Sequence, residues 1–314
     1  MNTSPLLVSR RASLRLLGAA VCAGAAGCQR DFNPGVRRFA VSFQTLNNPF
    51  FVELNDAIKA AVEARGGQLV TLDARHDSNK QRNDLSDAIQ QRPAAIFLNP
   101  VNWEGVRGSL VEAKRAGVPV IVIDTPVGDV DLVLAQVASD NVDAGRLAAR
   151  ALGKVKPAAQ VAIVHHSVAK ACIDRVAGFR EVASEKFTDM TILQTEEGKG
   201  TTEGARPVMV DLLGRFPKLD AVFAINDPSA IGCASAIEGT PGRAGKVAIV
   251  TVDGSKEGIA AVKDGRLLST SAQSPAEIGR VAVGLAFDHL DGKAVAKDVK
   301  IPVKLINREQ ADGP

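Results

Sequence analysis

Polar and aromatic side chains recur in this sequence where apolar runs end, and they could bind a small polar molecule there. The stretch Asn47-Asn48-Pro49-Phe50-Phe51 is the most concentrated example. An asparagine amide both donates to and accepts from hydroxyl groups, and a phenyl face suits the C–H side of a sugar ring. These residue types predict a wall of a binding cleft. The simpler alternative is that Asn48 caps a helix and that Phe50 and Phe51 are core residues.

The surrounding pattern places this stretch at a turn between a strand and a helix. Residues 39–43 are strand-like, and apolar residues recur at helical spacing from Phe51 until Gly66-Gly67. In a parallel sheet, ligands bind outside the carboxyl ends of the strands. The position therefore favours a binding role as well as a cap.

Polar residues also stand where other strand-like runs end. With the first stretch they make a set of six: Asn48, Asp124, His165, Asn226, Asp253 and Gln273. Each has a local alternative; Asp227 before Pro228 reads as a helix cap, for example, and Asp253-Gly254 as a turn. Six at equivalent places nevertheless predict one shared cleft.

Catalysis is not indicated by the residues around these positions. The sequence contains no G-x-S-x-G or H-E-x-x-H motif, and residues 198–202 lack the order of a phosphate-binding loop. His165-His166 has no third ligand at metal spacing. Asp124 and Asp253 are better explained as acceptors of hydrogen bonds from hydroxyls. We expect a binding protein that is not an enzyme and has neither cofactor nor metal.

Size and charge limit the choice of partner. The chain has 314 residues, 46% of them hydrophobic, and a net charge of +3 that includes the leader residues Arg10, Arg11 and Arg15. Without that leader the chain is near neutral, so no basic face for nucleic acid is predicted. The length favours two lobes, and we expect a monomer.

The first 28 residues have the order of an export signal: arginines, an apolar run from Leu16 to Ala26, and then small residues before Cys28. Ala25-Ala26-Gly27-Cys28 resembles a bacterial lipobox, which predicts a lipidated Cys28. Ala25 departs from that pattern, so ordinary cleavage remains open. Residues 9–15 resemble a twin-arginine signal, and the export route is likewise open.

Two other cysteines, Cys172 and Cys233, lie in separate helical segments. Both are predicted to be small buried residues, although an oxidising compartment would permit a bridge if they met.

Strand-like and helical runs alternate along the whole chain after a short tether. The strands of the first series are predicted to begin near Arg38, Gln68, Ala94 and Val118, with helices such as 80–91 and 105–116 between them. The strands of a second series are predicted at 160–165, 191–194, 221–225 and 247–253. The chain closes with three further elements, at 267–273, 275–290 and 299–306. This order predicts an α/β fold with parallel sheets covered on both faces. Pro302 marks an edge or a crossing between lobes.

Several of these motifs together resemble the periplasmic ribose-binding protein family, a group of type I solute-binding proteins. The motifs are 45–51, 138–141, 221–227, 252–254 and 272–273, in the family's order and spacing. The chain is similar to that family from residue 38 to about residue 306.

The resemblance implies two Rossmann-like lobes joined by three hinge crossings, near 139–140, 273–274 and 304–305. The expected division is an export signal (1–28), a tether (29–37), an amino-terminal lobe (38–139 plus 274–304) and a carboxyl-terminal lobe (140–273 plus 305–314).

Binding residues transfer only where this sequence keeps them. The resemblance assigns ligand binding to Asn48, Phe50, Phe51, Asp124, Asn226, Asp253 and Gln273.

Departures from the ribose pattern bear on the ligand. The family has an arginine after the strand-end aspartate, where this chain has Thr125, and a second ligand arginine where this chain has Ile173. The family's stacking aromatic falls near Gly198, and its early serine is replaced by Gln44. Loss of two arginines would leave buried carboxylates unpaired with ribose, so another sugar or a polyol is expected. Possible additional contacts are Gln44, Trp103, Thr125, His165, His166, Lys170 and Ile173.

The implied function is an exported protein of the periplasm that captures a monosaccharide or related polyol and delivers it to an ABC importer. A different output, presentation of the ligand to a membrane histidine kinase or chemoreceptor, would use the same fold. The effector domain of a LacI-type repressor also shares it. That class requires a helix-turn-helix before the first strand, where the export-like leader stands.

Overall fold

The structure is a computed structural model and describes Met1 and residues 35–311. The export signal, Cys28 with its expected lipid, and most of the tether lie outside the described residues. Among the helices that are described, none is long and apolar enough to cross a membrane.

The first sheet has six strands in the order β11-β5-β4-β3-β1-β2, and all neighbouring strands are parallel. Its strands are β1 (Arg38–Phe43), β2 (Gln68–Asp73), β3 (Ala95–Leu98), β4 (Val120–Ile123), β5 (Ala135–Ser139) and β11 (Asp298–Ile301). Every residue of β3 and β4 is buried, as expected for apolar strands in the middle of a parallel sheet.

The second sheet repeats this arrangement with the order β12-β10-β9-β8-β6-β7. Its strands are β6 (Gln160–His165), β7 (Thr191–Glu197), β8 (Ala221–Ala224), β9 (Ala248–Asp253), β10 (Ser269–Ala272) and β12 (Lys304–Asn307). Only β12 is antiparallel to its neighbour. The prediction of an α/β fold with two parallel units is confirmed.

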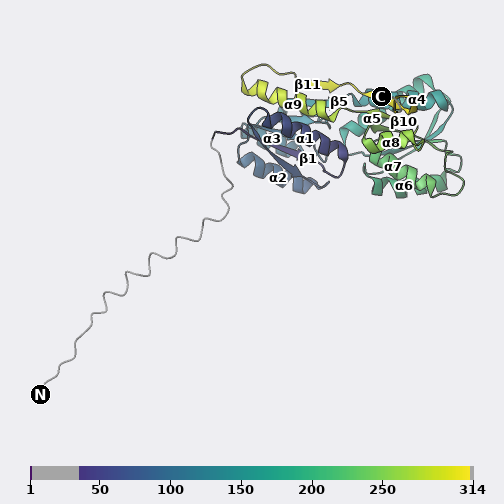
Figure 1. Cartoon of the computed structure of the whole chain (residues 1–314), viewed down its shortest axis with the longest axis horizontal. Coiled ribbons are helices and arrows are strands. Elements are labelled where there is room, and N and C mark those ends of the chain that lie inside the picture. Colours follow the sequence, from purple (N-terminus) through teal and green to yellow (C-terminus); the bar gives the residue numbers. More distant parts are fainter. Residues whose placement is uncertain (2–34, 312–314) are drawn as a thin grey trace. The chain divides into compact units, whose positions relative to one another are not determined.

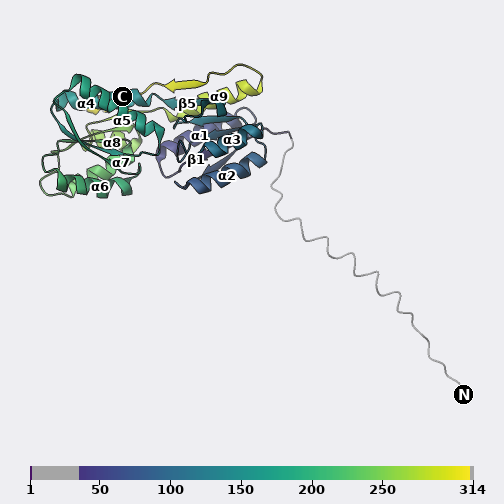
Figure 2. The ribbon, with the colours of Figure 1, turned by 180° about the vertical axis from the view of Figure 1, so that it is seen from behind.

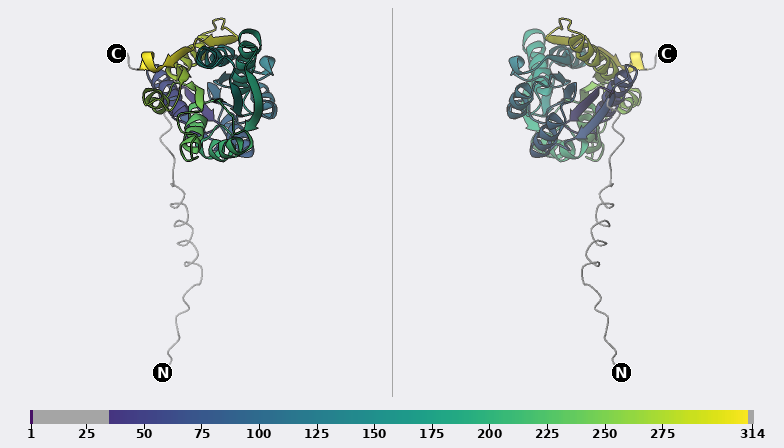
Figure 3. Two further views of the ribbon diagram at one scale, coloured as in Figure 1. Left: turned by 90° about the vertical axis from the view of Figure 1, so that its right-hand side faces the viewer. Right: turned by 90° about the vertical axis from the view of Figure 1, so that its left-hand side faces the viewer.

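Helices cover both faces of each sheet (Figures 1, 2 and 3). The first sheet packs against α1 (Pro49–Glu63) and α9 (Pro275–Leu290) on one face and against α2 (Ser78–Gln90) and α3 (Arg107–Arg115) on the other. We call this unit the first lobe; it also holds the short 3-10 helix η1 (Val130–Leu132).

The second sheet packs against α4 (Asn141–Val155) and α5 (Lys170–Lys186) on one face. The other face holds α6 (Thr202–Arg215), α7 (Asp227–Glu238), α8 (Lys256–Lys263) and the terminal α10 (Arg308–Ala311). We call this unit the second lobe. Cys172 in α5 and Cys233 in α7 are buried and free, as the sequence predicts.

The chain passes between the sheets at three places among the described residues. It leaves β5 for α4 at residues 139–141, leaves β10 for α9 at residues 272–275, and leaves β11 for β12 at Pro302-Val303. The third crossing lies about two residues before its expected position, because Lys304 already pairs with Ala272 in the second sheet. Proline has no N–H to donate, and the expected single strand 299–306 is accordingly broken at Pro302.

The two helices α4 and α5 approach each other more closely than side chains would allow. A Cβ atom on Gly145 would lie 1.8 Å from the Arg175 carbonyl oxygen, and one on Gly178 would lie 1.9 Å from the Val142 carbonyl oxygen. Only glycine permits this contact, which fixes α5 against the helix that begins at the first crossing.

We expect Gly178→Ala to lower the free energy of unfolding by about 1–3 kcal/mol or more, because the helices must separate. Gly284→Ala is the matched control: Gly284 lies within α9, and nothing stands within 4 Å of the added Cβ. The free energy of unfolding of that variant should rise by about 0.5–1 kcal/mol, because alanine has the higher helix propensity. Urea unfolding measures the free energy of both variants, and equal changes in the two would contradict the close contact between α4 and α5.

Candidate functional site

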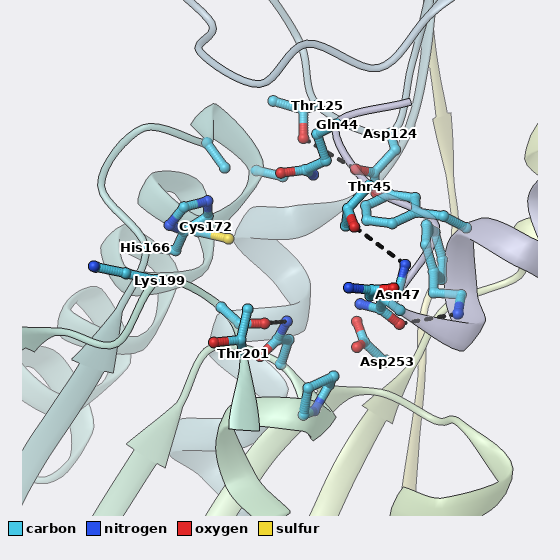
Figure 4. Close-up of a pocket in the computed structure, with 18 of the residues that line it drawn as sticks. Gln44, Thr45, Asn47, Asp124, Thr125, His166, Cys172, Lys199, Thr201 and Asp253 are labelled. Atoms are coloured by element: carbon cyan, nitrogen blue, oxygen red, sulfur yellow. Dashed lines mark hydrogen bonds between the residues drawn. The ribbon is translucent and has the colours of Figure 1, made fainter. Parts of the chain in front are cut away.

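A cavity of about 370 Å³ lies where the carboxyl ends of the two sheets meet, and both lobes line it (Figure 4). Gln44, Thr45 and Asp124 stand on one side in the figure, and His166, Cys172 and Lys199 stand across from them. Small-molecule pockets are typically about 300–1,000 Å³, so the size suits one small ligand.

Residues 48, 50 and 51 form a helix cap and part of the core, and they also line the cavity, so both alternatives from the sequence apply. The Asn48 Oδ1 atom accepts a hydrogen bond from the Phe50 backbone N–H at 2.9 Å and so caps α1. Phe50 and Phe51 are 5% and 6% exposed and belong to the core of the first lobe. All three residues also line the cavity. Capping uses the amide oxygen of Asn48, which leaves its NH₂ group for a ligand.

Asp124 follows β4 with a left-handed backbone (φ 63°), a conformation that is costly for most residues and common at functional sites. Its Oδ2 atom accepts hydrogen bonds from Asn99 Nδ2 and from Thr125 Oγ1, each at 3.0 Å. Burial raises the pKa of Asp124, while nearby Arg175 and these two hydrogen bonds act to lower it. The second carboxylate oxygen is available to the cavity.

Asp253 ends β9 and has the equivalent place in the second lobe, again with positive φ (133°). Its Oδ1 atom lies 3.6 Å from Arg175 Nη1, and both side chains are 4% exposed. Burial is the main cause that raises the pKa of Asp253 to about 7, and Arg175 opposes this effect. Asp227 lies beside it and donates its backbone N–H to Asp253 Oδ2 at 3.3 Å.

Arg175 is held from several directions. Its Nε atom donates to Asn141 Oδ1 and its Nη1 atom to the Ile225 carbonyl, each at 2.8 Å. Asn141 in turn donates to the Ser139 carbonyl at the first crossing. The guanidinium therefore connects α5, the end of β8 and the first crossing beside the cavity.

This geometry corrects the expectation that the cations of the site have been lost. Arg175 lines the cavity and faces Asp253, whereas Ile173 does not line it. Successive residues of a helix are turned by about 100°, so Cys172 and Arg175 share a face that Ile173 does not. The expectation of an unpaired Asp253 is wrong. Thr125 does line the cavity, in contact with Asp124.

Two amide side chains complete the second-lobe side. Asn226 caps α7 through Oδ1, which accepts from the Ser229 N–H at 3.0 Å, and donates Nδ2 to the Gly200 carbonyl at 2.9 Å. Gln273, at the second crossing, donates Nε2 to Asp253 Oδ1 at 2.8 Å. Its Oε1 atom is buried and has no hydrogen-bond partner among the described residues. A buried polar atom without a partner is costly, and a ligand donor would satisfy it.

Most of the predicted site residues line the cavity, and four do not. All seven assigned residues line the cavity, as do the possible contacts Gln44, Thr125 and His166. Trp103, His165, Lys170 and Ile173 are not among its lining residues. Neighbouring residues at a strand end point to opposite faces, so that His166 reaches the cavity and His165 does not. Lys170 pairs with Asp174, and the Trp103 backbone N–H donates to the Val168 carbonyl at 3.2 Å.

Sequence reasoning missed part of the lining. Asn47, from the predicted wall, lines the cavity, and the lining residues not predicted are Thr45, His76, Ala169, Ala171, Cys172, Arg175, Lys199, Gly200, Thr201, Thr202, Glu203 and Pro228. Gly198, near which the family's stacking aromatic falls, does not line the cavity; it is buried against Val164, and Lys199 and Gly200 line the cavity instead. Many of these residues lie in loops without a distinctive pattern. Asn99 is not among the lining residues, but it donates to Asp124 and had a usable signal, since it directly follows β3.

Comparison with known proteins places this chain in a family. The model of the periplasmic binding protein domain matches residues 39–294. The chain belongs to the periplasmic binding protein family. The resemblance noted in the sequence is thereby confirmed.

Relatives of this periplasmic binding protein match over most of their length. It is 36% identical over 286 residues to the ribose import binding protein RbsB of Bacillus subtilis (strain 168), covering 89% of this chain and 88% of the relative. It is 32% identical to RbsB of Escherichia coli (strain K12), covering 86% and 90%.

Solved structures give the same result for the fold. The binding protein of the arabinose ABC transporter from Shewanella sp. ANA-3, bound to L-arabinofuranose, superposes with a TM-score of 0.81 at 28% identity, covering 87% of this chain and 93% of that one. A solute-binding protein from Bacillus halodurans C-125 with bound myo-inositol gives 0.82 at 25% identity, covering 88% and 96%.

We expect Arg175→Met to lower the free energy of unfolding by about 3–5 kcal/mol at pH 8, because it leaves the Asp253 carboxylate buried without its cation. Asp253→Asn in the same chain should restore part of the loss. Arg175 lowers the pKa of Asp253, so its removal should raise that pKa further. Asp253 then becomes neutral as the pH falls, so the deficit should shrink between pH 8 and pH 5.

Urea unfolding at several pH values measures this pattern. Arg280→Met is the control, since Arg280 forms an exposed pair with Glu277 on α9 and its loss should change stability little at any pH. A deficit for Arg175→Met that grows in acid would contradict the assignment.

Proposed function

We propose that this protein is an exported solute-binding protein that captures a monosaccharide or related polyol in the cavity and delivers it to an ABC importer. Relatives at 36% and 32% identity are named as ribose import binding proteins, and similar structures hold an arabinose or myo-inositol. These names support the ligand class, and the chemistry of the cavity supports it independently.

The observation that carries the proposal is the set of unfilled hydrogen-bonding groups beside two phenyl rings. Asp124 and Gln273 Oε1, which has no partner among residues 35–311, offer acceptors, and the NH₂ group of Asn48 offers donors. Phe50 and Phe51 meet edge to face, with ring centroids 5.3 Å apart, and line the same cavity. Hydroxyl groups both donate and accept, so a hydroxylated ring fits this mixture.

Ribose returns to the set of candidate ligands. The absence of arginine at Thr125 and Ile173 disfavours ribose in the sequence, but Ile173 does not line the cavity, whereas Arg175 lines it beside Asp253. Only the arginine expected at Thr125 is absent from the lining. We therefore propose a pentose, a hexose or a polyol, with ribose included.

Lobe closure is the proposed mechanism. The chain crosses between the lobes three times in the described residues, and Gln273 lies at one of these crossings. A ligand that contacts Asp124 in the first lobe and Asp253 in the second would stabilise the closed form by its greater affinity for that form. The importer would then recognise the closed protein.

The periplasm is the proposed location, with export through residues 1–28 and anchoring through a lipid on Cys28. The family and its relatives support export. Mass spectrometry of the mature protein would test the anchor, since a diacylglycerol-modified amino-terminal Cys28 is expected.

Calorimetry and thermal-shift measurements against ribose, arabinose, allose, fructose and myo-inositol test the function. At least one should bind and raise the melting temperature. Asp124→Asn should weaken that binding by on the order of 10- to 100-fold, because a charge-assisted hydrogen bond is lost.

Asp189→Asn, at an exposed position outside the cavity, is the matched control and should bind like the wild type. A folded protein that responds to none of these compounds would exclude the ligand class. Equal affinities of both variants would exclude the assigned role of Asp124.

A further inference from the structure

Two histidines from opposite lobes face each other in the cavity. His76 follows β2 in the first lobe, and His166 follows β6 in the second. Their ring centroids are 6.4 Å apart, with the planes nearly perpendicular at 88°. Both residues line the cavity, so the contact spans the space between the lobes.

Each ring is supported from its own lobe. The His76 backbone has a left-handed conformation (φ 61°), and its N–H donates to the Gln44 carbonyl at 2.7 Å. His166 Nδ1 lies 3.3 Å from Glu197 Oε1. Left-handed backbone is uncommon for a residue other than glycine and is kept where surrounding contacts enforce it.

Glu197 is itself firmly held. Burial would raise the pKa of Glu197, but hydrogen bonds from His166, Ser167 and Lys199 lower it to about 2. The Ser167 N–H and hydroxyl both donate to Glu197 Oε2 at 2.7 Å. The loop that carries His166 is thus fixed by an ionised carboxylate.

A second contact between the lobes lies two residues further along the same loop. The Trp103 backbone N–H, from the first lobe, donates to the Val168 carbonyl at 3.2 Å. Residues 166–168 therefore contact the first lobe at two places, and the position of this loop reports whether the lobes are together.

We propose that the His76–His166 contact makes closure of the two lobes dependent on pH: the neutral rings pack together, and their protonation in acid separates the lobes. The inference concerns closure alone and does not require that the ligand be a sugar. Like charges at this spacing repel, and histidine is the side chain whose charge changes in mildly acidic solution.

Charged groups lie near both rings. Asp73 is near His76, whereas His165, Glu197 and Lys199 surround His166. Burial and then His166 lower the pKa of His76, and Asp73 opposes them less strongly. A lowered pKa means that this arrangement favours neutral His76. Its contribution to closure is therefore present at higher pH and is lost as the pH falls below about 6.5.

Small-angle X-ray scattering of the ligand-free full chain between pH 8 and pH 5 tests closure directly. Trp103 is the single tryptophan of a chain without tyrosine, so its emission wavelength gives a second readout at the contact. In the wild type, the radius of gyration should rise and the emission should shift to the red in acid. The equilibrium constant for lobe closure can fall by at most about tenfold per pH unit for each proton that the open form takes up.

His76→Gln and His166→Gln remove the two facing imidazoles, and His289→Gln on α9 outside the cavity is the control. Both cavity variants should lose most of the acid response, while the control keeps it. The residual response in the variants measures the buried carboxylates, which titrate in the same range. An unchanged radius of gyration in the wild type, or the same response in all three variants, would overturn the proposal.

Discussion

The pairing of Arg175 with Asp253 is the constraint on which the binding side of the second lobe depends. Two charged groups that are 4% exposed are stable only if they face each other and their other hydrogen bonds are filled. Asn141 and the Ile225 carbonyl fill those of Arg175. The glycines that let α4 and α5 approach closely hold the helix that carries Arg175. The close contact of α4 with α5, the Arg175–Asp253 pair and the first crossing are therefore connected through Arg175.

In the cavity, single side chains make a structural hydrogen bond with one atom and keep another atom available for a ligand. Asn48 uses its oxygen to cap a helix, and Asp124 uses one oxygen to bind Asn99 and Thr125. The part of each group that remains faces the cavity in a fixed direction. Such preorganisation reduces the entropy that a ligand must overcome when it binds. The same caps that begin the helices therefore also orient the binding groups.

Much of the fold and part of the site follow from sequence pattern and the family resemblance. Fully apolar runs such as 95–98 and 120–123 identify central strands, and Asp124, directly after the second run, lines the cavity. Loops and the first turns of helices contribute the remainder, and neither Lys199 nor His76 belongs to a periodic pattern that would locate it. The error at Ile173 arose because a shift of two residues along a helix changes its face. Only the folded arrangement shows that Arg175 is the residue at the cavity.

The two lobes carry an aspartate at equivalent strand ends: Asp124 directly follows β4, and Asp253 is the last residue of β9. Both line the cavity, so each lobe brings its own carboxylate to it. A substitution at one of these positions leaves the carboxylate of the other lobe in place.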